Sequence, residues 1–164
     1  MMDHIVSALK RFGSFLSKVL KSPIIKTIVT GSIGGATMGY FLPLELAVLF
    51  SCVLLFHEFS HYLTALIVNA KPQLPFFIPL GFAIIGITKV KGIKTKDVRL
   101  VALSGPIVGA FVSLTALLLG LVLGSSVLVI GASCSLVFEV YSGTLGSDGA
   151  KARKIQKMLT VASL

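Results

Sequence analysis

The residues of this sequence best suited to chemistry are two histidines and a glutamate in the segment LFHEFSHY, residues 55–62. His57 and His61 are four residues apart, so a helix places both imidazoles on one face, where they can bind the same metal ion. Glu58 stands next to His57, where a carboxylate can act as the general base that takes a proton from water. The pattern His-Glu-x-x-His is typical of a zinc site. It predicts one Zn²⁺ per chain, with Glu58 as the catalytic residue.

A catalytic zinc ion takes three protein ligands and leaves one position open for water. The remaining histidine, His4, lies close to the N-terminus, so the third ligand is expected to be a carboxylate. Among the other acidic residues, only Glu139 and Asp148 belong to a later apolar segment that can face the two histidines at the same depth. Asp148 is the preferred ligand, because the flanking Gly146 and Gly149 favour a flexible turn that can bring its carboxylate to the metal.

Both acidic residues also have other interpretations. Asp148 is followed by Gly-Ala-Lys-Ala, so it is equally a plausible N-cap of a C-terminal helix. Glu139 is a candidate for orienting one ligand histidine by accepting a hydrogen bond from its second ring nitrogen. Pairing of Glu139 with another polar group inside a helix bundle is as compatible with its position.

Composition places these residues in a membrane. The chain is 55% hydrophobic and only 13% charged, with a mean hydropathy of +0.97, which is outside the usual range of soluble domains. Three ionisable residues within five positions of an apolar helix are costly in a bilayer unless something compensates them. A bound zinc ion does so. The alternative is that His57, Glu58 and His61 hydrogen-bond to one another or line a path for protons or ions.

The distribution of the basic residues predicts how the chain crosses the bilayer. The formal net charge is +9, yet residues 27–70 and 100–150 contain no Lys or Arg. Each of these stretches can cross twice, since one crossing takes about 20 apolar residues. Two helical hairpins then place every basic cluster on one face of the membrane, which the positive-inside rule assigns to the cytoplasm. Both termini and the opening of the site are expected on this cytoplasmic side. A nucleic-acid partner is not expected, because aromatic and polar residues are not interleaved with these charges.

The expected fold class is an all-α membrane protein with about four transmembrane helices. Residues 1–22 are predicted to form an amphipathic surface helix, because their apolar residues recur at helical spacing among lysines. The transmembrane core is placed at 23–147 and a cytoplasmic tail at 148–164, so that residues 1–164 form a single membrane-embedded metalloprotease domain. The four predicted spans are 24–42, 45–69, 98–123 and 125–146.

Several details of these spans bear on packing. Gly31, Gly35 and Gly39 recur every four residues in the first span, which would let a neighbouring helix approach closely. Residues 72–92 are rich in Phe and Ile but interrupted by Pro and Gly, which predicts a β-hairpin or re-entrant loop that lines the site. Cys52 and Cys134 both lie in apolar runs, so a structural disulfide is not expected.

Four pieces of the sequence resemble the site-2 protease family of intramembrane zinc metalloproteases, over about residues 45–150. They are Phe56-His57-Glu58-Phe59-Ser60-His61, Phe77-Ile78-Pro79-Leu80-Gly81, Ser104-Gly105-Pro106 and Ser147-Asp148-Gly149. The resemblance implies a zinc ion held by His57, His61 and Asp148, with Glu58 as catalytic base. It also implies hydrolysis of peptide bonds in or near transmembrane segments of substrate proteins or peptide precursors.

The chain departs from the family pattern in two places. The family often has an asparagine shortly after the Gly-Pro pair, where this chain has Ile107-Val108-Gly109. The usual Asn- and Pro-rich approach to Asp-Gly is replaced by residues 140–146. The sequence therefore assigns no substrate-binding residue and no oligomeric state. A zinc-binding membrane scaffold without protease activity, and a small metal or proton transporter, remain alternatives that use the same ionisable residues.

Overall fold

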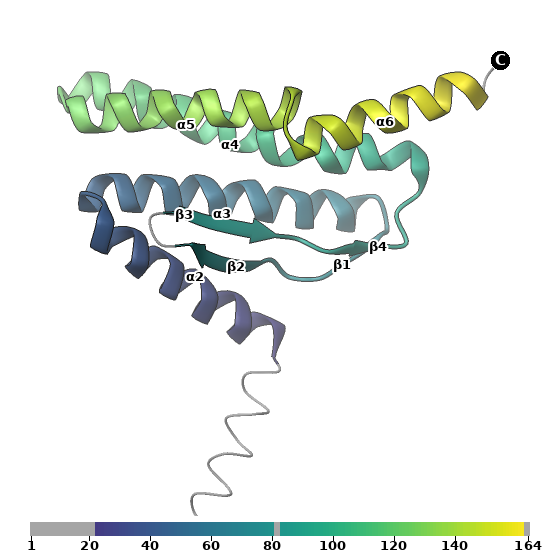
Figure 1. Cartoon of the computed structure of the whole chain (residues 1–164), viewed down its shortest axis with the longest axis horizontal. Helices are drawn as coiled ribbons and strands as arrows, with labels where there is room; N and C mark the ends of the chain where they lie inside the picture. The colour runs from purple at the N-terminus through teal and green to yellow at the C-terminus, as the bar shows by residue number, and fades with distance from the viewer. Residues whose placement is uncertain (1–21, 81–82, 163–164) are drawn as a thin grey trace, which may run out of the picture.

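Figure 1 shows the computed structural model of the chain, which describes residues 22–80 and 83–162. The amphipathic helix predicted for residues 1–22 therefore lies outside the described residues, apart from Ser22. The elements in chain order are α2 (Pro23–Phe41), α3 (Leu44–Ile67), β1 (Lys71–Pro72), β2 (Phe76–Leu80), β3 (Ala83–Ile87), β4 (Val90–Lys91), α4 (Thr95–Leu123), α5 (Ser126–Thr144) and α6 (Ser147–Ala162).

The helix α3 runs through the centre of the structure, between two layers (Figure 1). On one side lie α4, α5 and α6, and on the other lie the hairpin and α2. Leu49 and Val53 of α3 form a buried apolar cluster with Ala132 of α5. Between α4 and α5, the buried hydroxyl of Ser113 donates a hydrogen bond to Ser135 at 2.9 Å. His57, Glu58 and His61 of α3 are buried between these two layers.

Three helical segments are long and apolar enough to cross a membrane, within the described part of the chain. They are Leu44–Ile67, Thr95–Leu123 and Ser126–Ile155, the last of which joins α5 to the start of α6. The predicted first span does form the helix α2, but polar residues such as Lys26 and Thr27 lower its hydropathy and it is not among the three. The chain is thus a mainly helical protein suited to a membrane, while the number of four spans stays a prediction.

The segment 72–92 forms the predicted hairpin. β2 and β3 pair in antiparallel register, with Phe77 opposite Gly86, and the short strands β1 and β4 pair next to them. The hairpin lies against α2 through β2, and β3 reaches α3. The pairing satisfies the backbone groups on the facing edges of the two strands, which non-helical chain needs at membrane depth.

The glycines of α2 allow close approach, but partly to a different neighbour from the one predicted. A Cβ atom added at Gly34 would lie 2.8 Å from Cδ1 of Ile84, so the hairpin, and not only a helix, packs against this face. Gly35 and Gly39 face α3, where the nearest atoms to an added Cβ belong to Ser51 and Ala47. The small-residue stripe therefore seats α2 on the hairpin and on α3 together.

The C-terminal region differs from the expected turn and surface tail. The helix α6 begins at Ser147, so Asp148 lies in its first helical turn and not in a flexible loop. The start of α6 also belongs to the packed structure, since Asp148 and Ala152 are buried and the helix packs against α4. At Gly149 an added Cβ would lie 2.4 Å from the carbonyl oxygen of Thr144, so only glycine fits where α6 passes the end of α5.

Candidate metal centre

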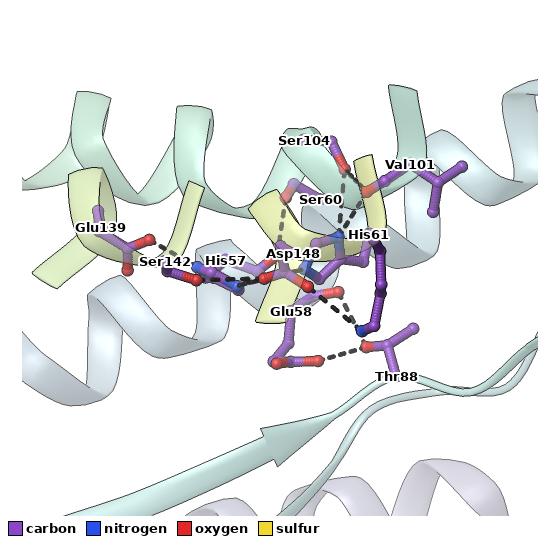
Figure 2. Close-up of polar contacts among 11 residues, drawn as sticks. His57, Glu58, Ser60, His61, Thr88, Val101, Ser104, Glu139, Ser142 and Asp148 are labelled. Atoms are coloured by element: carbon purple, nitrogen blue, oxygen red, sulfur yellow. Dashed lines mark hydrogen bonds and ion pairs between the residues drawn. The ribbon is translucent and has the colours of Figure 1, made fainter. Parts of the chain in front are cut away.

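Two helices supply three potential metal ligands to one point. His57 and His61 lie one turn apart on α3, and Asp148 approaches from the first turn of α6 (Figure 2). Their residues are only 6%, 8% and 7% exposed. Figure 2 shows both imidazoles and the Asp148 carboxylate turned toward one another. Residues separated by more than 80 positions in the sequence thus meet inside the protein.

The spacing of the three ligand atoms matches a tetrahedral metal site. Nε2 of His57 lies 3.2 Å from Nε2 of His61. Oδ2 of Asp148 lies 3.5 Å from the first nitrogen and 3.6 Å from the second. Ligands held about 2.0–2.1 Å from a tetrahedral zinc ion are about 3.3–3.4 Å apart. The group of His57, His61 and Asp148 could therefore hold a metal ion with little movement of the side chains.

Hydrogen bonds at the other ring nitrogens direct the lone pairs of both histidines to this point. Nδ1 of His61 lies 2.7 Å from the carbonyl oxygen of Val101, which can only accept, so a neutral His61 carries its hydrogen on Nδ1. Nδ1 of His57 lies 2.7 Å from Oε2 of Glu139, which favours the same tautomer there. Two acceptor nitrogens and a carboxylate oxygen then face one another. A bound cation would offset the repulsion between their lone pairs.

Glu139 contacts His57, as the orienting role suggested for it by the sequence requires. Its residue is 3% exposed, and its carboxylate reaches His57 from α5. Gly109 of α4 gives it room, since an added Cβ there would lie 2.4 Å from Cδ of Glu139. Glu139 itself is not part of the group that converges on the metal position.

Two further residues hold the Asp148 carboxylate. The hydroxyl of Ser142 donates to Oδ2 at 3.2 Å, and Nζ of Lys151 lies 3.4 Å from Oδ1. The sequence analysis singled out neither of them. The i, i+3 spacing of Asp148 and Lys151 on one helix was a usable signal, whereas nothing in the sequence pointed to Ser142.

Glu58 is buried in the same region but turns its carboxylate toward the hairpin (Figure 2). The hydroxyl of Thr88 donates to Oε2 of Glu58 at 2.6 Å and also lies 3.1 Å from the Glu58 carbonyl oxygen. Gly86 makes this approach of the hairpin feasible, because an added Cβ would lie 2.3 Å from Cγ of Glu58. Thr88 was missed by the sequence analysis, since it follows the end of a strand without any motif.

The helix α4 passes close to the ligand nitrogens at Gly105. An added Cβ there would lie 2.3 Å from Nε2 of His61 and 2.6 Å from Nε2 of His57. The next residue toward the N-terminus, Ser104, has its hydroxyl 3.4 Å from Nδ1 of His61. The Ser104-Gly105-Pro106 piece noted in the sequence is therefore located at the site, with glycine where any side chain would collide with the ligands.

One cavity of about 530 Å³ lies at the site. His57, Glu58, His61 and Asp148 line one part of it, with Glu139, Ser142 and Lys151 next to them. The opposite wall consists of the β3 residues 84–87 together with Thr88 and Val90. A single peptide segment in this cavity could therefore contact the candidate metal site, the Glu58 carboxylate and the strand β3.

Comparison of this chain with protein-family models, with curated proteins and with solved structures gives no match. What the protein does is therefore inferred from the arrangement of its own residues.

Proposed function

We propose that the chain is an intramembrane zinc metalloendopeptidase that hydrolyses peptide bonds in or near transmembrane segments of proteins or peptide precursors. The observation that carries this proposal is the convergence of two imidazole nitrogens and one carboxylate next to the buried Glu58, in a cavity bordered by a strand. A membrane-buried site of this type resembles that of the site-2 proteases, as the sequence motifs also suggest.

The donor set favours zinc over other common metals. Two imidazoles and one carboxylate at tetrahedral spacing suit Zn²⁺ in a catalytic site, which keeps its fourth position open. Ca²⁺ and Mg²⁺ require six or more oxygen ligands, which this group does not offer. The orienting contacts of His57 with Glu139 and of His61 with Val101 are of the kind that tunes zinc ligands.

In the proposed reaction zinc, when bound, supplies a Lewis acid that polarises the substrate carbonyl and activates water. Glu58 takes the proton of the attacking water and passes it to the nitrogen of the leaving amine. Thr88 donates to Oε2 of the Glu58 carboxylate, which orients the group and leaves Oε1 to take the proton. The burial of His57, Glu58 and His61 limits the access of bulk water to the reaction.

Strand addition at β3 is the proposed mode of substrate binding. Within the described residues, β3 pairs only with β2. Residues 84–87, which are most of β3, line the cavity. A transmembrane helix hides its peptide bonds, whereas a segment unwound along a strand exposes them and gains backbone hydrogen bonds. The partners in this proposal are a transmembrane or membrane-associated peptide and the lipid bilayer.

The proposed topology follows from charge. Four spans with both termini and residues 71–99 on the cytoplasmic side place every basic cluster on that face. His61 is closer than His57 to the end of α3 that leads into residues 71–99. The site would then open toward the cytoplasm.

The test is to purify the full-length chain in detergent, count zinc per chain by mass spectrometry of the metal, and assay a panel of transmembrane peptides. We expect one zinc in the wild type and in Glu58→Gln, with cleavage by the wild type only. Glu45→Gln is the matched control, because Glu45 is an exposed acid at the start of the same helix.

Two other outcomes identify the alternative functions. One zinc per chain with no cleavage by the wild type indicates a zinc-binding scaffold. Metal or proton flux through liposomes that contain the protein, lost on substitution of His57 or His61, indicates a transporter. Either outcome contradicts the proposed protease.

A further inference from the structure

A second cavity of about 350 Å³ adjoins the metal cavity. It is lined by residues of α3, α5, the start of β3 and the C-terminal end of α2. The two cavities have four lining residues in common, namely Leu54, Ile84, Phe138 and Glu139. The remaining lining residues of the second cavity are Met38, Leu42, Phe50, Val53, Ala83, Cys134 and Ser135. It is therefore a side chamber of the site already described.

The lining of the side chamber is suited to an apolar occupant. Its two strongly polar side chains already have partners, since Ser135 accepts a hydrogen bond from Ser113 and Glu139 contacts His57. Placing an unpaired polar group among the remaining apolar side chains would cost free energy. The volume is sufficient for a bulky side chain, because a cavity of about 150 Å³ already admits a benzene-sized molecule.

The strand β3 relates the side chamber to the catalytic groups. Gly86 and Thr88 contact Glu58, while Ala83 and Ile84 line the side chamber. Gly86 and Ile84 are two positions apart on β3, and an extended chain advances about 3.3 Å per residue, so these positions are about 7 Å apart. A substrate strand that lies along β3 with one peptide bond near Glu58 has another residue, about two positions away, at the side chamber.

From this arrangement we infer that the side chamber is a specificity site for one bulky apolar side chain of the substrate, of the size of Phe, Leu or Met. That residue lies within about two positions of the hydrolysed bond. The inference rests on the proposed function and deepens it. With such a site, the protein selects substrates by one residue close to the hydrolysed peptide bond and not by their overall hydropathy.

Disulfide trapping tests the location directly. Full-length Glu58→Gln, which leaves bound peptides intact, is prepared with Cys52→Ala so that Cys134 is the one remaining thiol. Peptides that the wild type cleaves, each with a single cysteine at successive positions around the bond, are oxidised with copper–phenanthroline. We expect a cross-link to Cys134 from one or two positions next to the bond.

The matched control moves the thiol three residues along the same helix, to a position that lines neither cavity. Val137 on α5 is 69% exposed and lines neither cavity, so Cys134→Ala with Val137→Cys should give no position-specific cross-link. Equal cross-linking of all peptide positions, or equal yields with the control, would overturn the inference.

Filling the side chamber gives an independent kinetic test. Cys134→Trp should lower kcat/KM about tenfold or more for a substrate with Phe at the trapped position, since apolar pockets discriminate by at least this factor. The same substrate with Ala at that position should be cleaved within twofold of the wild-type rate, and Val137→Trp should leave both rates unchanged. Equal loss on both substrates, or no loss on either, contradicts the specificity site.

The results separate the two proposals. A wild-type chain that binds zinc but cleaves no peptide contradicts the proposed function and the inference with it. A wild-type chain that cleaves peptides while Cys134→Trp leaves the preference unchanged contradicts the inference alone.

Discussion

The carboxylate of Glu139 on α5 lies 2.7 Å from Nδ1 of His57 on α3, although 82 positions separate the two residues in the sequence. This contact directs Nε2 of His57 to the point where Nε2 of His61 and Oδ2 of Asp148 also converge. The preference for one tautomer is what would let His57 bind a metal ion through Nε2.

Glu139→Gln should weaken zinc binding by about 10- to 100-fold, because the carboxylate that orients the ring and raises its basicity is replaced by a neutral amide. Titration against a zinc chelator of known affinity measures the change. Glu45→Gln, on the exposed start of α3, should leave the affinity unchanged. Equal zinc affinity of Glu139→Gln and wild type would show that the contact does not support a metal.

Gly105→Ala should abolish zinc binding. The added methyl group would lie 2.3 Å from Nε2 of His61, so the ligands must separate or α4 must shift. Metal analysis of the purified variant gives the zinc content, and its melting temperature reports the overpacking. Gly35→Ala is the control, because its Cβ finds ordinary contact at 3.5 Å from Ser51 and should retain zinc. Full zinc occupancy in Gly105→Ala would contradict the proposed ligand geometry.

Thr88→Val should lower kcat about tenfold or more while leaving zinc content unchanged. Valine keeps the shape of threonine but removes the hydroxyl that donates to the Glu58 carboxylate, and a hydrogen bond to a charged group contributes about 1.5–3 kcal/mol. Thr88→Ser restores the hydroxyl and should recover most of the rate. Steady-state kinetics on one peptide distinguish this effect from a change in KM. Equal rates for the valine and serine variants would remove Thr88 from the mechanism.

Lys151→Met should have a small effect on the metal site. The Lys151 side chain is 63% exposed, so its ion pair with Asp148 is screened by solvent and contributes about 1 kcal/mol or less. Zinc affinity should therefore fall by less than tenfold, as measured by chelator competition. Asp148→Ala, which removes a ligand, should eliminate high-affinity binding. A loss in Lys151→Met as large as that in Asp148→Ala would assign the lysine an essential role in holding the ligand.

Local sequence patterns were sufficient to predict the elements of this protein that depend on the spacing of residues along the chain. The i, i+4 spacing of His57 and His61 puts both rings on one helical face wherever that helix lies. Long apolar runs predict membrane helices, and the Pro and Gly residues within 72–92 exclude a helix there, as the hairpin confirms. The helix at 1–22 and the first predicted span, 24–42, stay predictions.

Only the tertiary structure decided which distant groups meet these histidines. Val101, Glu139 and Thr88 contact the site because α4, α5 and the hairpin pack against particular faces of α3. The first turn of α6, and not a free loop, brings Asp148 to the ligand position. Such contacts depend on how helices pack across the whole chain, where glycines such as Gly105 set the distances, and this information has no period along the sequence.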